Sequence, residues 1–182
     1  MFEEHASHFE TPIGGCGLAW SEAGLTRVVL PEATPEQTVA RLTRQGAMLA
    51  DANAAPAGIR AVMTALRTFL GGEDAAFDGV PLDMHRHSAF ERAAYEALRK
   101  VPWGRTVTYG DLAAAVGRPN GAQAIGMAMG RNSWPLVVPC HRVLGANGWL
   151  GGFSAPGGTV TKKALLAREG VYPDGGQMAL FE

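Results

Sequence analysis

Two short apolar runs near the N-terminus are bounded by turn-forming residues, a pattern typical of a β-hairpin. They occupy residues 16–20 and 25–30, with Ser-Glu-Ala-Gly between them. Helical spacing follows at 35–44, where proline stands near the start. A second helix is indicated at 59–70, because its apolar side chains recur three and four positions apart until Gly71. This part of the chain predicts a small antiparallel sheet with helices.

The second half of the chain predicts short helices instead of strands. Ser88 and Glu91 have the spacing of a capping box, so a helix is expected from there to about Lys100. Two further short helices are expected at 109–116 and 122–129, joined by a turn that contains glycine. Two short helices with such a turn are typical of a helix-turn-helix, which can bind DNA or can be purely structural.

The change of pattern divides the chain of 182 residues. We predict an α/β domain at 1–82, a mostly helical domain at 88–171 and a C-terminal tail at 172–182. The fold class expected is therefore α/β with a helical second domain.

Composition and charge narrow the class of protein. With 47% hydrophobic residues and a net charge of −1, disorder is excluded. No run of about 18 apolar residues is present, so no membrane partner is expected. The acidic start lacks the apolar core of a signal peptide, which favours a cytoplasmic location. Residues 1–87 carry 6 basic and 11 acidic side chains, a net charge of −5, whereas 88–182 carry 10 and 6, a net charge of +4. The basic half is the part that could face a polyanion.

The candidate chemistry lies in the segment 137–143, Val-Val-Pro-Cys-His-Arg-Val. Cys140 stands beside an imidazole and a guanidinium, and positive neighbours lower the pKa of a thiol and make it nucleophilic. The alternative is a buried structural cysteine with a satisfied histidine beside it. A metal site is not expected, because no Cys-x-x-Cys or His-Glu-x-x-His spacing is present.

The run Pro139-Cys140-His141-Arg142-Val143 resembles the active-site signature of the O6-alkylguanine-DNA alkyltransferase family, also called methylated-DNA–protein-cysteine methyltransferases. The resemblance extends almost continuously from Thr106 to Glu169. It includes Thr-Val-Thr-Tyr-Gly-Asp-Leu-Ala at 106–113, Ala-Ile-Gly-Met-Ala-Met at 124–129, Gly-Gly-Phe-Ser at 151–154 and Leu-Leu-Ala-Arg-Glu-Gly at 165–170. It implies a ribonuclease-H-like N-terminal domain and a winged-helix-like C-terminal domain with a helix-turn-helix.

The resemblance implies a set of catalytic residues. Cys140 would accept the alkyl group as a thiolate, and His141 would act as its base through a bound water. Glu169 would orient His141, and Asn132 would brace the active-site turn. Tyr109 would contact the flipped nucleotide and help to protonate the departing guanine. The thioether formed is stable, so each molecule would react once, without a cofactor.

Further residues would bind the substrate. By the same resemblance, Val143 and the carbonyl of Cys140 would line the base pocket, and Met129 would form an apolar wall. Ser154 would donate from its backbone to O6, and Lys162 would stabilise the loop that carries it.

The partner implied is double-stranded DNA that carries an alkylated guanine, bound by a monomer. The helix at 122–129 would lie in the minor groove, where the small Ala122 and Ala124 allow close approach to the backbone. Arg118 and Arg131 flank this helix and are candidate phosphate contacts.

Gln123 departs from the family pattern, which commonly has an arginine there to fill the space of the flipped base. Glutamine lacks the planar charge of guanidinium. Two alternatives therefore stay open: a cysteine alkyl acceptor for a small-molecule or non-duplex substrate, and a lesion-binding sensor without efficient transfer. A general Cys-His hydrolase is a further, less supported alternative.

Some family members bind a structural zinc near the N-terminus. The matching positions here, about Phe2, Ser21 and Thr26, are not zinc ligands, so no metal is predicted. Cys16 falls in a predicted strand and is expected to be a buried, inert thiol.

Overall fold

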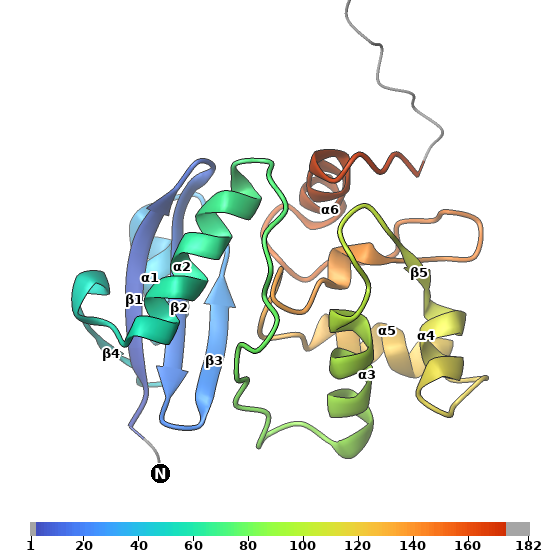
Figure 1. Ribbon diagram of the computed structural model, residues 1–182, viewed down its shortest axis with the longest axis horizontal. Helices are drawn as coiled ribbons and strands as arrows, with labels where there is room; N and C mark the ends of the chain where they lie inside the picture. The colour runs from blue at the N-terminus through green and yellow to red at the C-terminus, as the bar shows by residue number, and fades with distance from the viewer. Residues whose placement is uncertain (1–2, 174–182) are drawn as a thin grey trace, which may run out of the picture.

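The computed structural model describes residues 3–173 and places a sheet-containing part beside a helical part (Figure 1). The sheet contains β1 (His5–Thr11), β2 (Gly14–Ser21), β3 (Gly24–Val29) and β4 (Met48–Leu49), in the order β3-β2-β1-β4. The hairpin predicted from the two apolar runs is confirmed as β2 and β3. The sheet is mixed, because the short β4 pairs in parallel with β1 while the other pairings are antiparallel.

Two helices cover this sheet where the apolar spacing predicted them. They are α1 (Pro35–Thr43), whose N-cap is Thr34, and α2 (Ala57–Leu70). One 3₁₀ turn, η1 (Ala52–Ala54), lies between β4 and α2. The chain then runs along the free edge of β3, where Leu25 donates its backbone N–H to the carbonyl of Pro81 at 2.8 Å.

The helical part begins with α3 (Ala89–Arg99), and the predicted capping box of Ser88 and Glu91 is present. The predicted helix-turn-helix corresponds to α4 (Tyr109–Ala115) and α5 (Ala122–Gly130). The remaining elements are β5 (Val107–Thr108), the 3₁₀ turn η2 (Cys140–Arg142), β6 (Val143–Leu144), which pairs in parallel with β5, and α6 (Gly158–Arg168). The sequence pattern did not predict α6, because its Gly-Thr-Val-Thr-Lys-Lys start shows no apolar stripe.

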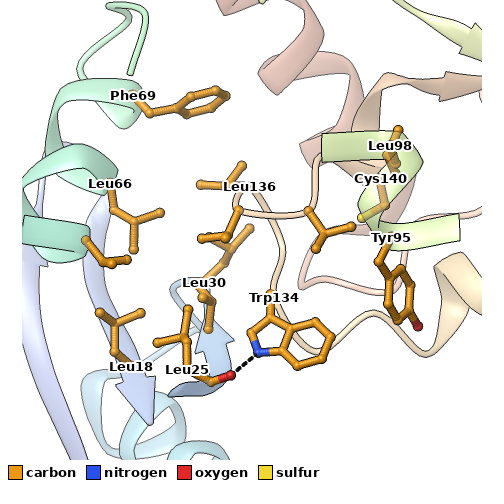
Figure 2. Close-up of a cluster of buried hydrophobic side chains, with 14 of the residues drawn as sticks. Leu18, Leu25, Leu30, Leu66, Phe69, Tyr95, Leu98, Trp134, Leu136 and Cys140 are labelled. Carbon is orange, nitrogen blue, oxygen red and sulfur yellow. Dashed lines mark hydrogen bonds between the residues drawn. The ribbon is translucent and has the colours of Figure 1, made fainter. Parts of the chain in front are cut away.

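One hydrophobic cluster joins the two parts (Figure 2). Leu66 and Phe69 of α2 lie at one end of the cluster, and Tyr95 of α3 lies at the other. Trp134 lies between them, and its indole N–H donates to the carbonyl of Leu25 at 2.7 Å. The division into domains at 1–82 and 88–171 stays a prediction, since the two parts share this core.

The segment that precedes Cys140 is therefore held against β3. Val28 donates its backbone N–H to the carbonyl of Ser133 at 2.8 Å, beside the Trp134 contact. Between residues 3 and 173, the structure has no helix with the length and apolar character needed to span a bilayer. The predicted tail lies mostly outside the described residues, as does Phe2.

Candidate active site

Cys140 stands at the start of η2, at the end of a segment that is tied down at several points. Asn132 donates from Nδ2 to the carbonyl of Val138 at 2.9 Å, and its Oδ1 accepts from the N–H of Trp134 at 2.9 Å. Leu136 has φ of 74°, a left-handed conformation that costs a non-glycine residue about 1 kcal/mol or more. Its side chain is only 1% exposed, so burial in the shared core holds this conformation. Asn132 therefore fixes the backbone between residues 132 and 138, just before the turn that contains Cys140.

A carboxylate gathers the two residues that follow Cys140. Glu169, at the end of α6, accepts from His141 Nε2 at 2.6 Å and from Arg142 Nε at 3.0 Å. The same carboxylate accepts the backbone N–H of Gly104 at 3.0 Å. Arg142 also donates to the carbonyl of Val101 at 2.6 Å, so its charge is directed away from the thiol. The group is fully packed, with His141 wholly buried and its ring edge-on to Phe69 at 5.7 Å between centroids.

His141 has the electrostatics of a neutral base. Burial lowers the pKa of His141 below 6.5, against the opposing effect of Glu169. Burial acts to raise the pKa of Glu169, but hydrogen bonds from His141 and Arg142 outweigh it, and the pKa is lowered. The imidazole is therefore neutral at pH 7 with its Nε2 on an ionised carboxylate. Its other nitrogen, Nδ1, is buried and has no hydrogen-bond partner, so it is the atom that can accept a proton.

The pKa of the Cys140 thiol shifts in the direction opposite to the one expected from the sequence. Burial raises its pKa above 9.0, although the hydrogen bond from Asn132 and the charge of Lys162 oppose this. The positive neighbours in sequence do not make it a resting thiolate, because Arg142 is neutralised by Glu169 and His141 is uncharged. To act as a nucleophile, the sulfur would therefore first have to give its proton to a base.

A cavity of about 890 Å³ opens onto this thiol. That volume lies near the upper end of the roughly 300–1,000 Å³ typical of small-molecule sites. Its walls are the N-terminus of α4, one face of α5 and the loop 145–154. The predicted residues that line it are Tyr109, Ala122, Gln123, Met129, Cys140 and Ser154. Ala124 and Val143 are not among the lining residues.

Lys162 acts behind the cavity wall. Its ammonium group is fully buried and donates to the carbonyls of Val143, at 2.7 Å, and of Leu150. Burial lowers the pKa of Lys162 to about 8. The residue therefore connects β6 to the middle of the loop 145–154, which carries Ser154, and it places a cation near the sulfur.

Tyr109 is the first residue of α4 and faces the same space. Burial and the nearby Cys140 sulfur both raise its pKa, so the phenol keeps its proton at neutral pH and can donate it in a hydrogen bond. The chain passes close to it at Gly151, where a Cβ would lie 2.5 Å from the phenolic oxygen. Gly151 also has φ of 66°, so glycine is required there on both counts.

The residues expected at a DNA backbone lie at the ends of α5. Ala122 and Gln123 are exposed at its N-terminus. Arg118 stacks over Phe90 at 5.2 Å, and Arg131 pairs with Glu91 at 3.2 Å. Both arginines are held on the surface near the start of α3.

Two features of the site were not predicted from the sequence. Arg142 was read only as a positive neighbour, whereas it neutralises and orients Glu169. Trp149, Met127 and Phe153 also line the cavity. The sequence signal that could have identified these three lining residues was a large apolar side chain among glycines, as at position 149.

Other sequence expectations concern the N-terminal part. Cys16 is fully buried, as predicted, and burial raises its pKa to about 11. At the positions compared with zinc ligands, Ser21 donates to Asp83 at 2.7 Å and Thr26 donates to Glu4.

A buried thiol in an open cavity, a histidine–carboxylate pair behind it and a helix-turn-helix along its wall define a class: cysteine-dependent proteins that act next to DNA. Residues 89–171 match the family described as 6-O-methylguanine DNA methyltransferase, DNA binding domain. The chain is 36% identical over 160 residues to a methylated-DNA–protein-cysteine methyltransferase of Mycolicibacterium paratuberculosis, covering 88% of each. It is 33% identical to that of Cricetulus griseus, covering 90% of this chain and 80% of the relative.

A solved structure supports the same family assignment as the sequence relatives. Mycobacterium tuberculosis OGT in complex with DNA is 34% identical, covers 91% of this chain and 92% of its own, and has a TM-score of 0.72. The chain belongs to the methylated-DNA–protein-cysteine methyltransferase family, and the resemblance found in the sequence is confirmed.

Proposed function

We propose that Cys140 is the acceptor to which this protein transfers an alkyl group from O6-alkylguanine in DNA. Alkyl transfer to a protein cysteine is the activity of the family. The observation that carries the assignment is that the cavity lined by Cys140 is also lined by exposed residues of α5. One space thus connects the thiol to the helix that faces DNA, and a nucleotide turned out of the duplex can enter it.

The reaction follows from these groups. His141, acting from Nδ1 through a bound water, takes the thiol proton, and Glu169 stabilises the imidazolium that forms. The sulfur attacks the alkyl carbon, the S–C bond forms, and the C–O6 bond breaks. Its electron pair goes to the guanine, which gains a proton in turn. One proton leaves the thiol and one enters guanine, so the transfer balances without a further reactant.

The remaining cavity residues position the base. Tyr109 donates its phenolic proton toward the departing guanine, and the backbone N–H of Ser154 donates to O6. Met129 provides an apolar wall, while Asn132 and Lys162 hold the segments that carry Cys140 and Ser154. Val143 lies outside the cavity lining, and its carbonyl accepts from the ammonium of Lys162 at 2.7 Å, which holds the backbone just beyond the turn that contains Cys140.

The partner proposed is duplex DNA with an alkylated guanine, bound by one copy of the chain. A relative of 34% identity has been crystallised in complex with DNA, which supports this assignment. Ala122, Ala124 and Gln123 would face the groove, and Arg118 and Arg131 would contact phosphates. The cytoplasmic location stays a prediction.

Peptide mapping tests the proposed function. After incubation with a duplex that contains O6-methylguanine, trypsin should release a peptide of residues 132–142 that has gained one methyl group. The other cysteine lies in the separate peptide 1–27. Tight binding without any gain of mass would instead support a lesion sensor. A gain from free O6-alkylguanine but none from the duplex would support the small-molecule alternative, which the neutral Gln123 motivates.

Salt dependence tests the two phosphate contacts. Replacing Arg118 or Arg131 by alanine should lower the slope of log affinity against log salt by about one each, because each contact releases about one counterion. The matched control is Arg44→Ala, an exposed arginine in the N-terminal part. An unchanged slope in either variant would remove that arginine from the interface.

A further inference from the structure

Trp149 has an unusual position for an indole. Its side chain is 70% exposed, whereas Trp20 and Trp134 are 6% and 0% exposed. It lies on the loop 145–151 and lines the cavity that opens onto Cys140. Leaving a large aromatic ring in water is unfavourable, and exposed apolar groups at the rim of a cavity are typical of a binding surface.

The backbone of Trp149 is fixed although its ring is exposed. The carbonyl of Trp149 accepts from the N–H of Gly145 at 2.7 Å, and Gly148 donates to the carbonyl of Gly145 at 3.0 Å. The next carbonyl, of Leu150, accepts from the buried ammonium of Lys162. The ring is therefore presented from a pinned turn, so a ligand that contacts it would not have to order the loop.

A second exposed apolar side chain lines the same cavity from a different wall. Met127, on α5, is 56% exposed. Together Trp149 and Met127 form an apolar rim, one member on the loop and the other on the helix expected to face DNA. Such a rim fits a flat, apolar face rather than a charged phosphate.

The depth of the site decides which part of the substrate reaches this rim. Transfer requires the alkyl carbon on O6 to meet the sulfur of Cys140, which is only 4% exposed. The O6 substituent is thus the innermost part of the bound nucleotide. What remains at the exposed rim is the sugar and the lesion-bearing strand beside it.

We propose that Trp149, with Met127, binds the lesion-bearing strand at the cavity rim, the indole covering a base face that is uncovered when the nucleotide leaves the stack. The inference rests on the proposed function. Contacts between aromatic rings and bases are tolerant of sequence, as a protein that meets lesions in any context requires. This contact carries no charge, so it adds to the phosphate contacts without depending on salt.

The test measures single-turnover methyl transfer from an O6-methylguanine duplex at limiting DNA. Trp149→Ala should slow transfer about tenfold or more. Trp149→Phe, which keeps an aromatic face, should stay close to the wild type. Val160→Ala is the matched control, because Val160 is 76% exposed on α6 and lies outside the cavity lining. The salt dependence of the rate should be the same in Trp149→Ala as in the wild type.

Labelling of Cys140 by iodoacetamide, read from the peptide 132–142, shows whether the cavity itself is intact, since this reagent needs no DNA. The proposal predicts equal labelling in the wild type and Trp149→Ala. Unchanged transfer from DNA in Trp149→Ala would overturn it, as would slowed labelling that matches the slowed transfer. A wild type that takes iodoacetamide but no methyl group would instead show that the proposed function has failed.

Discussion

Replacing Cys140 by serine should abolish the gain of a methyl group from O6-methylguanine DNA, at any reaction time and DNA concentration. A serine hydroxyl is far less acidic than a thiol and is a weaker nucleophile toward carbon, so His141 cannot activate it in the same way. The wild type should gain one methyl group per molecule and no more, because a thioether on Cys140 has no bond that water cleaves readily. The intact mass of each protein, measured after incubation with an excess of lesion-bearing DNA, tests both expectations.

The other thiol provides the matched control. Cys16 is fully buried in β2, and burial raises its pKa to about 11, so it has no access to DNA and little thiolate. Cys16→Ala should therefore take one methyl group, as the wild type does. A methyl group found on the peptide 1–27, or any gain of mass in Cys140→Ser, would contradict the assignment of the acceptor.

Local signals in the sequence explain why so many elements were predicted. The capping box of Ser88 and Glu91 is an interaction within three residues, so spacing alone reveals it. The apolar stripe at 59–70 likewise predicts α2 because one buried face is enough to define it.

Elements that depend on long-range contacts could not be predicted from local sequence. β4 is only two residues long, and both are exposed, so no apolar pattern distinguishes it from a loop. Its pairing with β1 depends on where α1 returns the chain. The same holds for α6, whose residues pack against the turn that contains Cys140 without forming a regular stripe.

Part of the active site could likewise be predicted from adjacent residues, and part depends on distant contacts. The adjacent Cys140 and His141 stand out in the sequence, but their partner Glu169 lies 28 residues beyond His141 and was found only through the family resemblance. The direction of the Cys140 pKa shift could not be read from neighbours in sequence. It depends on burial and on Arg142 turning to Glu169, and both are properties of the folded chain.

Replacing His141 by glutamine should slow methyl transfer at pH 7 by about 10²- to 10⁴-fold, the usual contribution of a positioned base. Glutamine can still donate an amide N–H to Glu169, so the buried carboxylate keeps a partner and the fold is retained. Without the imidazole, reaction depends on the small fraction of Cys140 that is ionised by solvent. Burial raises that pKa above 9.0, so the fraction is low at neutral pH.

The pH profiles of the two proteins should therefore differ in shape. On the acid side, transfer by the wild type should fall only below pH 6.5, because burial lowers the pKa of His141 and the base stays neutral until then. In His141→Gln, the rate should still be rising with pH between pH 7 and 9, since the thiolate fraction grows with pH up to the raised pKa of Cys140. Single-turnover rates on lesion duplex at constant salt give both profiles.

The matched control is His8→Gln, which removes an imidazole on β1 whose Nε2 is also buried without a hydrogen-bond partner. It should keep the wild-type rate and profile. A rate of His141→Gln that is flat from pH 7 to 9 would mean that Cys140 is already ionised at rest. If His141→Gln reacted at the wild-type rate at pH 7, another group would be accepting the thiol proton of Cys140. Either result would remove His141 from the role of base, while the acceptor assigned to Cys140 would stand on its own measurement.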